Sequence, residues 1–206
     1  MGFIENLKNK LEDGLPGVEG QKTMAPMEIG DSRFGRMPSD ARKAAVLCLF
    51  YQDGKGEWRF PLIQRPEYPG SHGGQVSFPG GKIERQERAE DAALRETHEE
   101  IGVWPDEVRL LGNLSDLYIP VSGFVVSPFL GYASAEPTFK PDPREVSGIL
   151  YPTLEDLSKQ FSEGPGTAII ETSYGRMKVP SFDVDGSVVW GATAIIIGEL
   201  LTLLKD

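Results

Sequence analysis

Three carboxylates, Glu96, Glu99 and Glu100, stand close together in the sequence just before Gly102. At 3.6 residues per turn, Glu99 and Glu100 lie about 60° and 40° on either side of Glu96, so the three side chains share one face of a helix. Such a cluster at a helix C-terminus is unfavourable, because the helix dipole is negative there and the charges repel one another. A positive group is therefore expected beside them.

A hard divalent cation is the best candidate for that positive group. Arg95 can pair with Glu99 at i,i+4, but it projects about 100° away from Glu96 and is not expected to neutralise the whole cluster. Oxygen ligands suit Mg²⁺ or Mn²⁺, and Mg²⁺ is typically completed by substrate phosphates, as in phosphoryl transfer. The alternative is a solvated acidic face, which is the usual explanation of an isolated Glu-Glu pair.

The sequence around the carboxylates resembles the signature of the Nudix hydrolases, G-x5-E-x7-R-E-U-x-E-E-x-G-U, in which U is bulky and apolar. Residues 81–103 read GKIERQERAEDAALRETHEEIGV, and we call them the box. The only departure is Thr97 at the first U position. The residues that match are Gly81, Glu87, Arg95, Glu96, Glu99, Glu100, Gly102 and Val103.

The resemblance implies hydrolysis of a nucleoside diphosphate linked to another moiety, with Mg²⁺ or Mn²⁺ as cofactor. It implies an orienting role for Arg95 and for Glu87 within the box. The metal ligands that it implies are the backbone carbonyl of Gly80 and the carboxylates of Glu96, Glu99 and Glu100.

The general base is left open among several carboxylates. Glu99 and Glu100 are candidates, and Glu145 stands at a suitable place in a later loop. Asp142 belongs to the same loop, but it lies between two prolines, where an Asp is a natural turn residue.

The residues before the box suggest the substrate. Residues 62–81, LIQRPEYPGSHGGQVSFPGG, resemble the coenzyme A diphosphatase branch of the family, which implies coenzyme A or acyl-CoA as substrate. Arg65, His72 and Lys82 are the candidates for substrate binding. Gly70 departs from the branch, where an Arg is usual and would suit a phosphate. ADP-ribose or a dinucleotide is the alternative substrate, and a nucleotide-sensing module without turnover is a third interpretation.

The composition limits which classes of binding partner are expected. The 206-residue chain has a formal net charge of −10, which argues against a nucleic-acid polymer and favours a small phosphorylated ligand. The charge-free stretch 117–135 is interrupted by prolines and glycines, so it is not a membrane span. The single cysteine, Cys48, fits a core position and a cytoplasmic location. The family resemblance leaves a homodimer open.

The elements that must position the box do not alternate regularly, which predicts a mixed sheet between helices. This agrees with the α/β/α sandwich with a mixed central sheet that the resemblance implies. We expect one domain, 1–206, made of an N-terminal helix and loop arm, 1–38, and a catalytic core, 39–206. The expected helices are 3–11, 88–100, 154–161 with Thr153 as N-cap, and 190–204; the expected strands are 43–52, 57–64, 108–117, 124–132, 145–151, 168–171 and 176–182.

Overall fold

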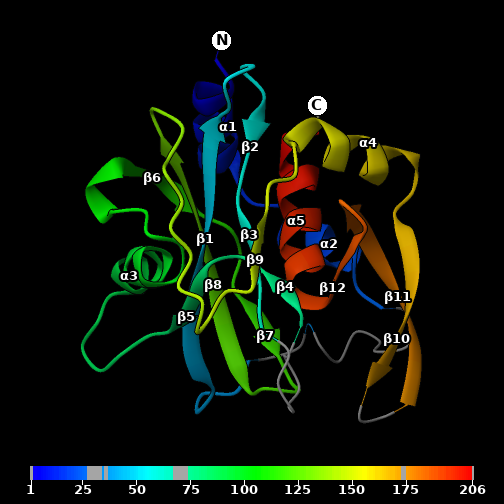
Figure 1. The fold of residues 1–206 in the computed structure, drawn as a ribbon. Coiled ribbons are helices and arrows are strands. Elements are labelled where there is room, and N and C mark those ends of the chain that lie inside the picture. The colour runs from blue at the N-terminus through cyan, green and yellow to red at the C-terminus, as the bar shows by residue number, and fades with distance from the viewer. Residues whose placement is uncertain (1, 27–33, 35–36, 67–73, 173–174, 206) are drawn as a thin grey trace.

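A mixed sheet of six strands forms the centre of the molecule (Figure 1). The computed structural model describes residues 2–26, 34, 37–66, 74–172 and 175–205. The two long strands, β1 and β8, are parallel, and the other pairings are antiparallel, as a mixed sheet requires. The six strands are β1 (Arg42–Gln52), β2 (Trp58–Arg59), β5 (Gly80–Lys82), β6 (Val108–Asn113), β7 (Leu117–Ile119) and β8 (Phe124–Ala133).

Helices cover both faces of this sheet, which confirms the α/β/α sandwich (Figure 1). Side chains alternate along β1, so Leu47 and Leu49 face α3 while Cys48 and Phe50 face the opposite core. Each face therefore has its own apolar cluster. The helix on the first face is α3 (Ala89–Ile101), which the short turn η3 (Pro105–Glu107) follows; those on the second are α1 (Phe3–Asp13), α2 (Gly17–Lys22) and α5 (Gly191–Leu204).

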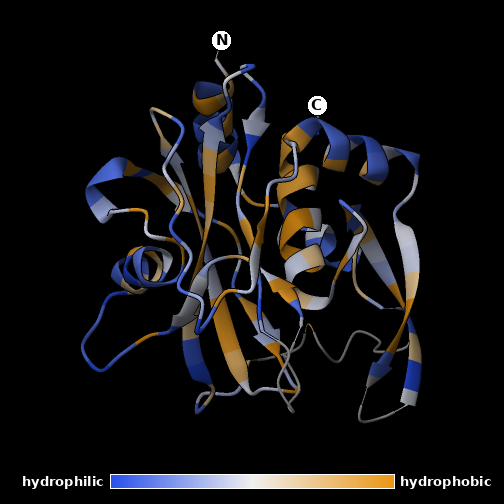
Figure 2. Cartoon of the chain, viewed as in Figure 1, coloured by the Kyte–Doolittle hydropathy of each residue, from blue (hydrophilic) through white to orange (hydrophobic). Residues whose placement is uncertain are grey.

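The C-terminal helix α5 is predominantly apolar (Figure 2). It lies between the central sheet and a second sheet of three strands, so every residue from Thr193 to Leu201 is buried. The expected helix 190–204 is confirmed, whereas the second sheet was only partly predicted. That sheet consists of β10 (Gly166–Thr172), β11 (Gly175–Val184) and β12 (Ser187–Trp190), of which β12 was not predicted.

A third small sheet has the strand order β4-β3-β9. The expected strand 57–64 is interrupted at Pro61, which has no N–H to donate, so β2 pairs with β1 and β3 pairs with β4 and β9. The strand expected from 145 begins only at Gly148, and Glu145 lies in the preceding turn. The strands are β3 (Leu62–Gln64), β4 (Val76–Ser77) and β9 (Gly148–Leu150).

The N-terminal arm packs into the second core. Leu7 of α1 and Met24, just after α2, are fully buried there. The sequence predicted a loop where α2 forms. We propose from this packing that the arm and core make one domain. Helix α4 (Leu154–Glu163) begins as expected, since the Thr153 hydroxyl accepts the amide N–H of Asp156 at 3.0 Å. Within the described residues, no helix is long and apolar enough to cross a membrane.

Candidate active site

Helix α3 ends at Gly102, and this ending fixes where the box carboxylates stand. Gly102 has a left-handed backbone (φ 76°), and its N–H donates to the carbonyl of His98 at 2.9 Å. A Cβ at Gly102 would also lie 2.8 Å from the Cβ of Lys140. Buried Ala92 and Ala93 let the helix approach β1 closely. Only glycine therefore combines this backbone shape with this close contact.

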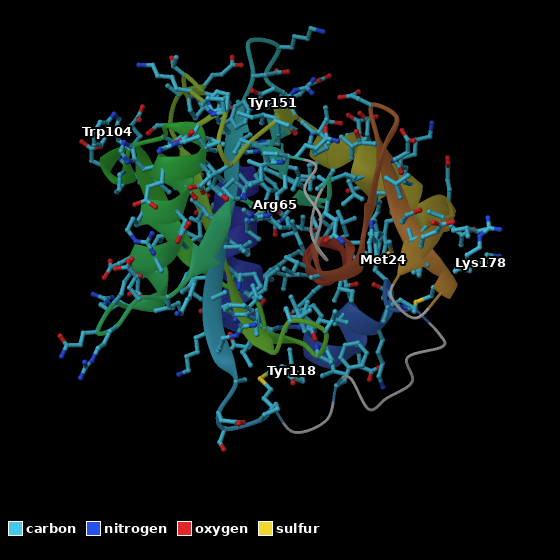
Figure 3. The ribbon with its side chains drawn as sticks, turned by 60° about the horizontal axis from the view of Figure 1, so that its bottom comes forward. Met24, Arg65, Trp104, Tyr118, Tyr151 and Lys178 are labelled. Carbon is cyan, nitrogen blue, oxygen red and sulfur yellow. The ribbon has the colours of Figure 1, made fainter. Side chains whose placement is uncertain are left out.

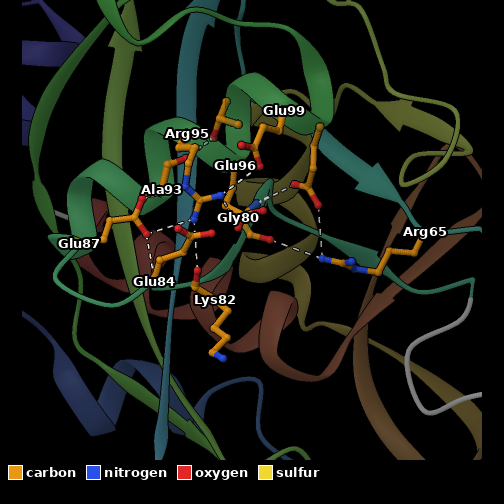
Figure 4. Close-up of polar contacts among 11 residues, drawn as sticks. Arg65, Gly80, Lys82, Glu84, Glu87, Ala93, Arg95, Glu96 and Glu99 are labelled. Atoms are coloured by element: carbon orange, nitrogen blue, oxygen red, sulfur yellow. Dashed lines mark hydrogen bonds and ion pairs between the residues drawn. The ribbon is translucent and has the colours of Figure 1, made fainter.

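Arg95 gathers the acidic side chains of the box (Figure 4). Its Nε donates to Glu87 Oε1 at 2.8 Å, and its Nη1 contacts Glu96 at 2.8 Å and Glu99 at 3.0 Å. Its Nη2 also donates to the carbonyl of Lys82 at 3.3 Å. Arg95 reaches Glu96 although the two side chains leave the helix about 100° apart, because the long side chain folds back. Glu100 pairs with Arg65 instead, so the expectation that Arg95 would not neutralise the whole cluster is confirmed. The Arg95 guanidinium lowers the pKa of Glu87.

Glu100 points the other way, toward the strand that carries Gly80. It is 1% exposed, and its Oε2 accepts the N–H of Gly80 at 2.8 Å. Burial raises the pKa of Glu100 to about 7, although the Gly80 N–H and the charge of Arg65 act in the opposite direction. The buried carboxylate is therefore short of positive charge.

The oxygen atoms here suit a hard cation. The Gly80 carbonyl and Glu100 Oε1 both face the Arg65 side chain, since each lies 3.5 Å from its Nη2. A Cβ on Gly81 would lie 2.5 and 2.6 Å from the carboxylate oxygens of Glu96, so the glycine leaves room for that group. Among the described residues, no three acidic, cysteine or histidine side chains are arranged so that they could hold a metal ion. Glu96 and Glu99 are instead bound by Arg95.

A turn from a distant part of the chain brings Glu145 to the same site. Burial is the main cause of the raised pKa of Glu96 and Glu100, and the negative charge of Glu145 raises both further. Asp142 lies in the same turn, but its carboxylate is bound by Arg144, which holds the pKa of Asp142 at about 2. Glu145 therefore lies near the box, whereas the carboxylate of Asp142 is bound by Arg144.

The three candidates for substrate binding differ in how the structure places them. Arg65 contacts Glu100, and it lies near the centre of the view in Figure 3, whereas Trp104 lies at the edge of that view. The side chain of Lys82 points away from the carboxylates in Figure 4, and its carbonyl alone contacts Arg95. His72 and Gly70 lie outside the described residues. No local pattern predicted the contact of the Lys82 carbonyl with Arg95, because it depends on how β5 packs against α3.

Comparison with known proteins identifies the family. Residues 41–170 match the NUDIX domain. Over 136 residues the chain is 35% identical to an uncharacterized Nudix hydrolase, NudL, of Pectobacterium atrosepticum, which covers 66% of this chain and 69% of that protein. Over 137 residues it is 34% identical to the mitochondrial coenzyme A diphosphatase NUDT8 of Homo sapiens, covering 66% and 58%.

The fold agrees with this match. The crystal structure of a MutT/nudix family protein from Enterococcus faecalis superposes with a TM-score of 0.52 at 17% identity, covering 86% of this chain and 68% of that one. The box, the sandwich that carries it and the matched domain therefore lead to one conclusion: the chain belongs to the Nudix hydrolases, enzymes that act on the pyrophosphate bond of nucleoside diphosphate derivatives.

Proposed function

We propose that this protein hydrolyses the diphosphate bond of coenzyme A or acyl-CoA. The products would be adenosine 3′,5′-bisphosphate and 4′-phosphopantetheine or its acyl derivative. The observation that carries the proposal is the position of Arg65, which belongs to the segment 62–81 that resembles coenzyme A diphosphatases and reaches Glu100 of the box. The 34% identity to a human coenzyme A diphosphatase supports the same substrate.

Nudix hydrolases generally need divalent metal ions, and we propose Mg²⁺ or Mn²⁺ here. Its ligands would be the carbonyl of Gly80 and the carboxylates of Glu96, Glu99 and Glu100. When bound, such an ion stabilises negative charge on the phosphoryl oxygens and lowers the pKa of a coordinated water.

The residues around the proposed metal site have separate proposed roles in orientation, proton transfer and substrate binding. Arg95 orients Glu96 and Glu99 through the contacts described above. Glu145 is free of the hydrogen bonds that engage Asp142, and with Glu99 and Glu100 it is a candidate to accept a proton from water. Arg65 would bind the diphosphate, and His72 and Lys82 remain predicted substrate-binding residues.

A second substrate class is favoured by one observation. Gly70 stands where coenzyme A diphosphatases usually have an Arg, so one contact to a phosphate is absent or supplied by another group. ADP-ribose or a dinucleotide is therefore the second candidate. The net charge of −10 supports a small ligand instead of a nucleic-acid polymer. A cytoplasmic location, with no membrane partner, and a homodimer remain predictions.

The test is a comparison of diphosphate substrates. The purified protein is assayed with Mg²⁺ or Mn²⁺ on coenzyme A, acetyl-CoA, ADP-ribose and diadenosine tetraphosphate, and both products are identified by mass spectrometry. We expect the highest kcat/KM for coenzyme A or its acyl form. The variant Glu100→Gln controls for contaminating hydrolases. Efficient cleavage of ADP-ribose with no cleavage of coenzyme A would contradict the coenzyme A proposal and leave the family assignment intact.

A further inference from the structure

Arg65 projects from the end of β3 toward the box. Its backbone N–H donates to the carbonyl of Gln75 at 3.0 Å, which continues the pairing of β3 with β4 by one residue. Side chains alternate along a strand, so Arg65 lies on the same side as Ile63, which is buried in the α3 core. In Figure 4, Arg65 reaches the carboxylates from the side opposite Arg95.

Within the part of the chain that the structure describes, Arg65 is the one cation that pairs with Glu100. Its Nη2 lies 3.5 Å from Glu100 Oε1, while Arg95 pairs with Glu87, Glu96 and Glu99. Glu100 is 1% exposed, and water therefore supplies little of the charge compensation that a buried carboxylate needs. Arg65 is 30% exposed, so it stays connected to the solvent.

The same nitrogen faces two of the oxygens that we propose as metal ligands, one from Gly80 and one from Glu100. Nη2 is 3.5 Å from the Gly80 carbonyl and 3.5 Å from Glu100, whereas Mg²⁺ binds oxygen at about 2.0–2.1 Å. A divalent cation held by these oxygens would repel the guanidinium. Contacts as long as 3.5 Å are weak, so Arg65 can be displaced at little cost.

We propose that Arg65 is a resident counter-ion of the box that competes with the divalent metal for Glu100 and the Gly80 carbonyl. On metal binding the guanidinium is released and turns to the diphosphate of the substrate, which makes the metal bind before the substrate. This inference rests on the proposed function. The opposite role, in which Arg65 orients Glu100 for the metal, predicts the opposite sign in the following measurement.

The first experiment measures Mn²⁺ affinity by electron paramagnetic resonance in the absence of substrate. If Arg65 competes with the metal, Arg65→Gln binds Mn²⁺ about two- to fivefold more tightly than wild type, a range typical of partly exposed ion pairs. Arg109→Gln is the matched control, since it removes one positive charge from an exposed position on β6. We expect no change in that variant. Weaker or unchanged Mn²⁺ binding in Arg65→Gln would overturn the inference.

The second experiment measures binding of ADP, used as a diphosphate probe, with and without Mg²⁺. Release of Arg65 predicts that Mg²⁺ strengthens ADP binding in wild type and that Arg65→Gln weakens the Mg²⁺-dependent binding by roughly tenfold. Equal ADP affinity in both proteins with Mg²⁺ present would overturn the second half of the inference.

The two proposals fail in different ways. Absence of Mn²⁺ binding in wild type would contradict both the metal-dependent function and the role of Arg65. Normal Mn²⁺ binding in wild type, with no gain in Arg65→Gln, would contradict only the competition. A thermal unfolding scan gives a further readout, because Mg²⁺ should raise the Tm of Arg65→Gln by more than it raises the Tm of wild type.

Discussion

The backbone N–H of Asp142 donates a hydrogen bond to the carbonyl oxygen of Glu100 at 3.0 Å. Next to it, the N–H of Lys140 donates to the carbonyl of Ile101 at 2.8 Å. The last carbonyls of a helix have no partner within the helix, so these two bonds satisfy them and tie the turn 142–145 to the end of α3. The position of Glu145 relative to the box carboxylates therefore follows from backbone contacts.

This arrangement predicts different effects for the two acids of the turn. Glu145→Gln removes a charge that faces Glu96 and Glu100, and we expect kcat to fall by about 100-fold if Glu145 accepts a proton. Asp142→Asn keeps the backbone bond to Glu100 and changes only the contact with Arg144, so we expect less than about a threefold loss. Steady-state kcat with coenzyme A and Mg²⁺ distinguishes them. Similar losses in both variants would exclude Glu145 as the base.

The box carboxylates are expected to be essential for turnover but not for folding. The two variants are Glu99→Gln and Glu100→Gln. Glu99 is 52% exposed, and in Glu100→Gln the side-chain amide oxygen can still accept the Gly80 N–H, so circular dichroism should show a native fold in both. We expect kcat to fall by about 100-fold or more in each, since each removes a charge from the proposed metal site. Mg²⁺ should raise the Tm of wild type more than that of either variant. Turnover at the wild-type level would refute the metal assignment.

Local patterns predicted most of the box, and long-range contacts account for what was missed. The helix 88–100 and its shared carboxylate face follow from residue spacing alone, and the structure has α3 at Ala89–Ile101. The reach of Arg95 to Glu96 depends on side-chain folding, which helical angles do not describe. The engagement of Asp142 by Arg144 does follow the turn signal of its two flanking prolines.

The remaining differences concern elements whose partners lie far away in the sequence. Pro61 is a local signal that the strand 57–64 would break. That its second part, β3, belongs to a different sheet depends on the pairing of β3 with β9. The full burial of α5 requires β10–β12 on its outer side, and β12 is only four residues long. Helix α2 has six residues, too few for a clear apolar period, and its packing on α5 stabilises it.

Gly81 is expected to support activity because it leaves room for the Glu96 carboxylate, not because its backbone conformation requires glycine. A Cβ there would lie 2.4 Å from the carboxylate carbon of Glu96, so Gly81→Ala must push that group aside. Displacing this proposed metal ligand should lower kcat/KM by roughly tenfold or more with little loss of stability. Gly54→Ala is the matched control, because a Cβ at Gly54 meets nothing within 4 Å. Equal kcat/KM in the two variants would contradict a role for the space beside Glu96.

The turn between β1 and β2 should make stability depend on pH in acid. The Arg59 side chain donates to Asp53 at 2.7 Å, and with the N–H groups of Glu57 and Lys55 it lowers the pKa of Asp53 to about 2. An unfolded Asp has a pKa of about 3.9, so the folded state binds its proton more weakly. The stabilisation is therefore present above about pH 4 and is lost as the pH falls toward 2.

Asp53→Asn removes this titration and tests its sign. We expect the free energy of unfolding, from urea titrations between pH 2 and pH 5, to differ most between wild type and variant at the upper end and to converge at the lower end. Arg59→Gln supplies the control, because in that background Asp53 has lost its main partner and the added change Asp53→Asn should have a smaller and flatter effect. A wild-type advantage that grew as the pH fell would show that Asp53 is not stabilised in its charged form.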